Sequence, residues 1–130
     1  MKHIHFDVKS DGFYGAYWEC KGGSDCTVIA MLGDDPEDHM ARSAVKWLLR
    51  LGVNVLTMSP AKKDYSHHNY PLECIEKAIA WLKSHGSTKI GIAGASTTGT
   101  LALTAASIFD DISLTVAMTP SDFVWQGFMQ

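Results

Sequence analysis

The chain has 130 residues, a length typical of one domain, with 46% hydrophobic residues, 19% charged residues and a net charge of −3 at pH 7. This charge argues against a nucleic-acid partner, which usually binds a basic face, and three irregularly spaced cysteines argue against a disulfide framework. Because there is no signal-peptide pattern and no run of roughly 20 apolar residues, we expect a cytoplasmic protein with no membrane partner.

The first 32 residues are typical of strands. Ile4, Phe6 and Val8 alternate with polar residues, which is the period-2 pattern of a half-buried strand. Residues 13–19 are rich in aromatic side chains and suit a second strand. Residues 27–32 are apolar without alternation, which indicates a strand buried on both faces, as in a parallel sheet.

A helix is predicted next, with Asp35 as its N-cap, Pro36 as its first residue and Gly52 as its stop. Apolar residues recur along it at helical spacing and predict a core-facing stripe. They are Met40, Ala44, Trp47, Leu48 and Leu51. Trp47, like Trp81 on the following predicted helix, is interpreted as a core residue.

Strands and helices continue to alternate along the rest of the chain. Strands are predicted at 53–58, 89–93 and 114–118, a polar loop at 59–69, and a helix at 99–109. A further amphipathic helix is formed by Leu72, Ile75, Ile79 and Leu82 and ends at Gly86. This alternation predicts a doubly wound α/β fold with a parallel sheet, whose functional groups gather beyond the carboxyl ends of the strands.

The most informative stretch is the predicted strand that runs into Gly94-Ala95-Ser96 and the small-residue helix that follows at once. This is the context of the G-x-S-x-G nucleophile elbow, in which a serine occupies a tight, strained turn at a helix N-terminus. The N–H of Thr97 is a predicted oxyanion donor. The spacing departs from the pattern: Thr98 replaces the second glycine, which moves to Gly99, and a β-branched residue there is expected to hinder close packing.

The second oxyanion donor of such a site comes from the loop after the strand at 27–32. Gly33 lets the backbone of this loop turn toward the site, and the N–H of Asp34 is the predicted donor. An alternative is that residues 33–35 form only a turn and a helix cap, and the two interpretations are compatible.

The strand order, the loop at 32–35, the elbow at 94–96 and the segment at 119–128 resemble α/β-hydrolases. The chain looks most like the acyl-CoA thioester hydrolase and bile-acid-CoA:amino-acid N-acyltransferase C-terminal domain group. The resemblance implies a mostly parallel sheet with antiparallel leading strands, apparently truncated after the elbow helix and the next strand. Residues 1–130 are thus expected to be the N-terminal portion of one hydrolase domain.

The resemblance also implies acyl transfer from a small-molecule ester or thioester to water or an amine, without cofactor or metal. Ser96 is the implied nucleophile, with Thr97 and Asp34 as the oxyanion donors. A serine needs a base, but no histidine follows Ser96, so we expect the base and the acid beyond residue 130.

Other polar residues are weaker candidates. Asp110 and Asp111 are interpreted as surface turn residues on the edge of the sheet away from Ser96, and Asp122 has no histidine to orient. His67 and His68 lie in the loop at 59–69, where one could approach Ser96 or, with Cys74, bind a metal, although a solvated loop is the simpler interpretation.

Two other functions are open. A dinucleotide-binding domain shares the strand, glycine-rich turn and helix, but the G-x-G-x-x-G spacing and the later acid are absent. A non-catalytic pseudo-hydrolase or interaction module would keep the sheet without the triad. The strand at 114–118 would then be an exposed edge, through which a homo-oligomer could form.

Overall fold

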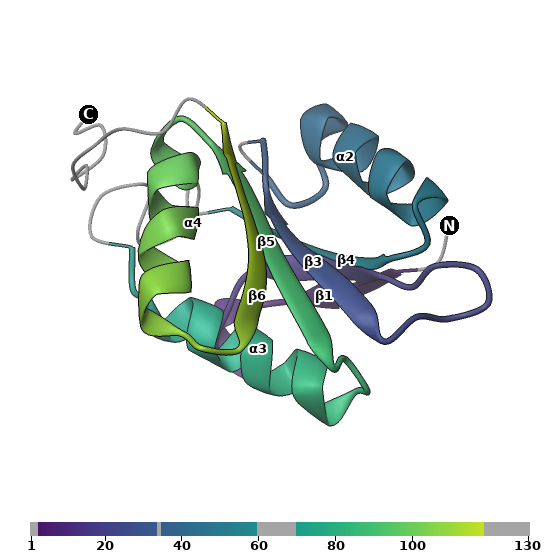
Figure 1. The fold of residues 1–130 in the computed structure, drawn as a ribbon, viewed down its shortest axis with the longest axis horizontal. Coiled ribbons are helices and arrows are strands. Elements are labelled where there is room, and N and C mark those ends of the chain that lie inside the picture. Colours follow the sequence, from purple (N-terminus) through teal and green to yellow (C-terminus); the bar gives the residue numbers. More distant parts are fainter. Residues whose placement is uncertain (1–2, 34, 60–69, 119–130) are drawn as a thin grey trace.

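A computed structural model describes residues 3–33, 35–59 and 70–118 (Figure 1). These residues form strands and helices that alternate through most of the chain. In chain order they are β1 (His3–Phe6), α1 (Val8–Asp11), β2 (Gly15–Trp18), β3 (Cys26–Met31), α2 (His39–Arg50), β4 (Asn54–Met58), α3 (Glu73–Ser84), β5 (Lys89–Ala95), α4 (Thr97–Ile108) and β6 (Ile112–Met118).

The strands make one sheet in the order β1-β2-β4-β3-β5-β6. The β1–β2 and β2–β4 pairs are antiparallel, whereas β3–β4, β3–β5 and β5–β6 are parallel. The predicted α/β class, with a mostly parallel sheet and antiparallel leading strands, is therefore confirmed. Because β3, β4, β5 and β6 run in one direction, their carboxyl ends share one edge of the sheet.

Helices cover both faces of the sheet, with α2 on one side and α3 and α4 on the other (Figure 1). Alternate residues of each strand therefore enter different cores. Ala30 and Val55 pack with Val45 of α2, while Ile29 and Leu56 belong to the larger cluster that includes α3 and α4. The apolar run without alternation that marked β3 reflects this burial on both faces.

Two local predictions were wrong. Val8 does not extend the first strand but begins the single helical turn α1. The second helix starts at His39 with Asp38 as its N-cap, because Asp38 accepts the Ala41 N–H. The side chain of Asp35 instead accepts hydrogen bonds from Tyr14 and from the Glu37 N–H, so it closes a turn ahead of the helix.

The predicted apolar stripe of α2 meets the sheet only in part, because Leu48 packs against the core cluster around Val45. Helix α2 buries Ala41 and Val45, whereas Trp47 is 68% exposed and Met40 and Leu51 are similarly open. The prediction that Trp47 is a core residue was therefore wrong. Trp81 is partly buried against the larger core, with its ring in contact with Phe6 and Tyr17, so its prediction was right.

An apolar surface runs from α2 to β6. It borders a cavity of about 690 Å³ whose lining is almost wholly apolar. We call it the α2–β6 face and define it by the exposed side chains of Met40, Trp47, Leu51, Leu114, Val116 and Met118. Helix α2 packs over β3 and β4, which leaves β6 without cover on this side within the described part of the chain.

No helix among the described residues is long and apolar enough to cross a membrane.

Candidate active site

Ser96 lies between the last residue of β5 and the first residue of α4, in a strained backbone conformation. Its φ of 55° and ψ of −120° make it the one non-glycine residue with positive φ in the described ranges. Such conformations cost about 1–3 kcal/mol and persist only where the surrounding structure enforces them. The predicted strand, strained turn and helix are all present.

Close backbone contacts enforce this turn. A Cβ on Gly94 would lie 2.2 Å from the carbonyl oxygen of Thr98, and one on Gly99 would lie 3.2 Å from that of Met118. The Ser96 N–H donates to Met118 O at 2.8 Å, which ties the turn to the end of β6. Glycine at 94 and 99 thus allows the strand–helix approach that the sequence predicted.

The side chain of Ser96 is exposed and makes no capping hydrogen bond to α4. Thr97 is the first residue of this 12-residue helix, so its N–H belongs to the first turn, where the N–H groups point out of the helix end. The positive end of the helix dipole lies at the same place. An oxyanion that forms next to Ser96 would therefore meet a favourable electrostatic environment.

Thr98 does not hinder the packing of the elbow, contrary to the expectation for a β-branched residue. Its side chain is buried and its hydroxyl contacts the ends of β3 and β5, while Gly99 makes the close approach. The shifted glycine therefore leaves the turn intact.

The loop after β3 lies beside the elbow. Met31 of β3 lies opposite Gly94 of the parallel strand β5. Gly33 and Ser96 each lie two residues beyond this pair, so the two turns are neighbours at the same edge of the sheet. Gly33 has a φ of 93°, and a Cβ there would lie 2.4 Å from the Asp38 carboxylate, so this position requires glycine. Asp34, the predicted second donor, lies outside the described residues.

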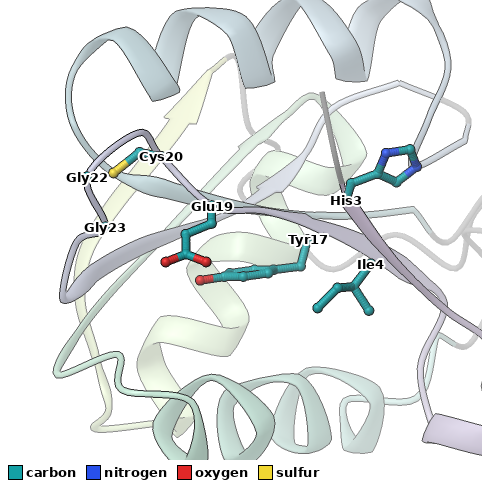
Figure 2. Close-up of a pocket in the computed structure, with 7 residues that line it drawn as sticks. All are labelled: His3, Ile4, Tyr17, Glu19, Cys20, Gly22 and Gly23. Atoms are coloured by element: carbon teal, nitrogen blue, oxygen red, sulfur yellow. The ribbon is translucent and has the colours of Figure 1, made fainter.

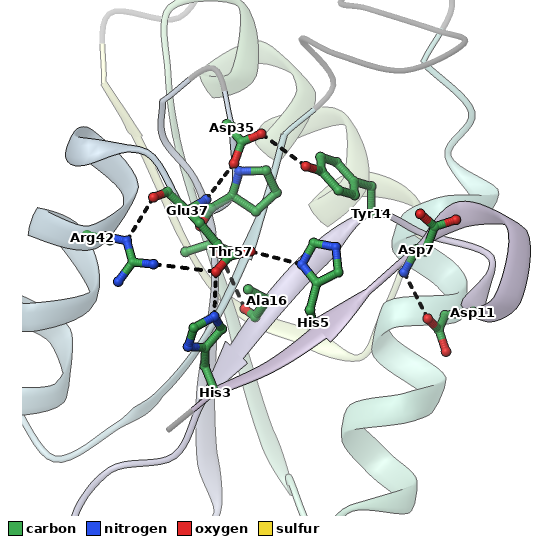
Figure 3. Close-up of polar contacts among 11 residues, drawn as sticks. His3, His5, Asp7, Asp11, Tyr14, Ala16, Asp35, Glu37, Arg42 and Thr57 are labelled. Carbon is green, nitrogen blue, oxygen red and sulfur yellow. Dashed lines mark hydrogen bonds and ion pairs between the residues drawn. The ribbon is translucent and has the colours of Figure 1, made fainter. Parts of the chain in front are cut away.

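Hydrogen bonds from β4 and from the residue that follows it hold this loop. The Ser59 hydroxyl donates to Gly33 O at 3.3 Å, and the Thr57 hydroxyl donates to Pro36 O at 2.6 Å. The Tyr14 hydroxyl donates to Asp35 Oδ2 at 3.0 Å from the other side (Figure 3). Burial, and then the hydrogen bond and charge of Asp35, raise the pKa of Tyr14 to about 12, so this donor keeps its proton at ordinary pH.

A second polar group anchors the same loop to β1, and the sequence did not predict it. His3 and His5 both contact the carboxylate of Glu37, His5 at 2.9 Å, and Arg42 approaches it at 3.5 Å (Figure 3). Glu37 is 34 and 32 residues from the two histidines, so no local pattern signals the cluster. Among the described residues no group of His, Cys, Asp and Glu side chains could hold a metal ion.

The other residues considered from the sequence do not join Ser96. Three of the described histidines make side-chain hydrogen bonds, and none of these bonds is to Ser96. His3 and His5 contact Glu37, and His85 contacts the Ser84 hydroxyl and the Trp81 carbonyl. Asp110 and Asp111 precede β6 at its amino end, where Asp111 pairs with Lys83, so their assignment to a surface turn away from Ser96 was right. His67, His68 and Asp122 lie outside the described residues.

A surface cavity of about 1000 Å³ lies at the edge of the sheet opposite to the carboxyl edge that carries Ser96. Its lining includes His3, Tyr17, Glu19 and Cys20 (Figure 2). The Cys20 N–H donates to the side chain of Asn54, the first residue of β4, which places the cavity near the amino ends of the parallel strands. It is therefore not the candidate active site.

Comparison with solved structures returns hydrolases. The chain is similar to an esterase from Pyrococcus furiosus (25% identity, TM-score 0.66, 83% of this chain and 44% of that chain). It is similar in fold to the α/β hydrolase GrgF from Penicillium sp. sh18 (17% identity, TM-score 0.69, 92% and 45%). It is also similar in fold to Est1E from Butyrivibrio proteoclasticus, which was solved with ferulic acid bound (19% identity, TM-score 0.64, 90% and 52%). The chain spans about half the length of these solved structures.

The sheet order, the strained elbow and these similarities define the class: the chain has the fold of the α/β-hydrolases. More particularly, residues 70–130 match the family model described as BAAT / Acyl-CoA thioester hydrolase C terminal, as the sequence resemblance implied. No curated protein gave a match.

Proposed function

We propose that this protein is a serine-dependent acyl hydrolase or acyltransferase that acts on an ester or thioester. One observation carries the proposal: Ser96 adopts a strained turn between β5 and α4 with its side chain exposed at the carboxyl edge of the sheet. A serine with no catalytic task gains nothing from a conformation that costs about 1–3 kcal/mol.

In the proposed reaction, Ser96 Oγ attacks the acyl carbonyl and its proton passes to a histidine base. The N–H groups of Thr97 and Asp34 stabilise the negative charge on the carbonyl oxygen. The tetrahedral intermediate then collapses, the bond to the alcohol or thiol breaks, and the base protonates that leaving group. Water or an amine takes the acyl group from Ser96. The base and the acid are predicted in the part of the hydrolase domain that follows residue 130.

A small-molecule acyl ester or thioester is the proposed substrate class. The description of the matched family supports a thioester, and the Pyrococcus furiosus esterase supports an ester. The cytoplasmic location stays a prediction from the sequence.

The test is acylation of the complete protein by a fluorophosphonate probe. The wild type is expected to react, and Ser96→Ala is expected to lose all labelling, because loss of a nucleophilic serine lowers kcat by on the order of 10⁶-fold. Ser107→Ala is the matched control: it removes an exposed hydroxyl from the same helix and should leave labelling unchanged. Equal labelling of wild type and Ser96→Ala would overturn the proposal.

A second candidate, a non-catalytic pseudo-hydrolase or interaction module, is favoured by the α2–β6 face. Trp47 and Leu114 are 68% and 62% exposed on this face, and large apolar patches mark interaction sites. A homo-oligomer through the edge of β6 stays a prediction of this second candidate. The probe distinguishes the candidates, since a pseudo-hydrolase would not be acylated at Ser96.

A further inference from the structure

The hydroxyl of Thr98 sits where the ladder between β3 and β5 ends. Its Oγ1 lies 2.7 Å from the carbonyl oxygen of Met31 and 2.8 Å from that of Ala95. It also accepts the Ala95 N–H at 2.9 Å. Since Thr98 is only 6% exposed, water does not compete well for these contacts.

The two residues that this hydroxyl contacts lie next to the two parts of the proposed site, the nucleophile and the oxyanion loop. Ala95 directly precedes Ser96, so its position fixes the position of the Ser96 backbone. Met31 is the last residue of β3, and two residues later Gly33 begins the turn that carries the predicted oxyanion donor. The last β3–β5 pair joins Met31 and Gly94, so beyond it Thr98 is a side-chain link between the two segments.

This link is absent from the ordinary elbow pattern. In G-x-S-x-G the position of Thr98 is a glycine, which has no side chain with which to make it. Here Gly99 supplies the close approach to Gly94 and Met118, which leaves position 98 able to hold a hydroxyl.

We propose that Thr98 is a positioning residue, whose hydroxyl fixes the separation between the Ser96 nucleophile and the oxyanion loop after β3. This inference rests on the proposed acyl-transfer function. Without the hydroxyl, the elbow and the loop can shift relative to one another, and a misplacement of about 1 Å can lower a rate by roughly 100-fold.

The test compares variants at position 98 in the complete protein. Thr98→Val keeps the shape and removes the hydroxyl, and Thr98→Ser keeps the hydroxyl and removes the methyl group. The second-order rate constant for fluorophosphonate acylation is expected to fall roughly 10- to 100-fold in Thr98→Val and to stay within about threefold of wild type in Thr98→Ser. With an ester substrate, the loss should appear in kcat rather than in KM, because the link aligns reacting groups.

Thr104→Val is the matched control. It makes the same substitution on the same helix, where the lost hydroxyl bonds only to the Thr100 carbonyl at 2.9 Å. Its acylation rate should equal that of wild type. If Thr98→Val does not fold at the assay temperature, the comparison of Thr98→Ser with Thr98→Ala replaces it, since these two differ by a single oxygen atom.

The outcomes separate the two proposals. Acylation of Thr98→Val at the wild-type rate, or an equal loss in Thr98→Ser, would overturn the positioning role and leave the proposed function standing. A wild type that is not acylated would overturn the proposed function, and the positioning role with it.

Discussion

Two glycines of β5 predict opposite responses to the same substitution. Gly94 and Gly91 are both buried and lie three residues apart. A Cβ at position 94 would lie 2.2 Å from Thr98 O and 2.9 Å from Gly99 N, both backbone atoms of α4. A Cβ at position 91 would lie 3.4 Å or more from its nearest neighbours, which is ordinary contact.

The geometry sets the size of the difference. Real Cβ atoms hardly ever come closer than 3.0 Å, so in Gly94→Ala the 2.2 Å contact must lengthen by about 0.8 Å, and only a shift of the β5 or α4 backbone can do this. We expect a loss of about 3 kcal/mol in the free energy of unfolding, the upper end for overpacking. Gly91→Ala should change it by less than about 1 kcal/mol, because reduced entropy of the unfolded chain offsets a mild contact.

Urea unfolding of the complete protein, followed by circular dichroism, measures both variants. With a slope of about 1–3 kcal/mol per molar urea, the Gly94→Ala midpoint should fall by roughly 1–3 M, and the Gly91→Ala midpoint should hardly move. Equal midpoints for the two variants would refute the claim that close approach of backbone, rather than burial, requires glycine at position 94.

Two further predictions concern hydroxyl groups of side chains. The raised pKa of Tyr14, about 12 against an ordinary 10.0, means that between pH 10 and pH 12 the unfolded chain loses a proton that the folded chain keeps. Wild-type unfolding free energy should therefore be intact up to about pH 9, begin to fall as the pH approaches 10, and be lower by about 1 kcal/mol at pH 11 from this group. Tyr14→Phe should lack this part of the fall in urea titrations, and an identical pH dependence would contradict the assignment. The Thr27 and Ser87 hydroxyls are 2.7 Å apart in the core. The double variant Thr27→Val/Ser87→Ala should lose about 1 kcal/mol less than the sum of the single variants, and strict additivity would show that the pair does not interact.

Much of the fold could be predicted because its signals are local. The predicted strands at 27–32, 53–58 and 89–93 match β3, β4 and β5 closely, since a strand buried on both faces is apolar at most of its positions. The position of Ser96 was predictable for a similar reason: strand, glycine, serine and helix follow one another directly along the chain.

What the sequence did not reveal depends on distant contacts. Helix α2 carries apolar residues on more than one face, and only the packing of Val45 against β3 and β4 shows which of them are buried and leaves Trp47 exposed. Asp35 and Asp38 are equally good caps by chemistry, but the bond from Tyr14 engages the first. The contact between Thr98 and Met31 spans 67 residues, so no local pattern could distinguish this threonine from an unfavourable replacement of glycine.

The bond between the Ser96 N–H and the Met118 carbonyl bears on how the chain folds. The central strand β3 must first find β5, with Cys26 opposite Lys89, and pairings between such distant residues form slowly. Ser96 then needs β6, because one of the bonds that enforce its strained conformation comes from the last residue of that strand. We therefore expect the elbow to be among the last parts of the described fold to form, after the sheet that surrounds it is largely assembled.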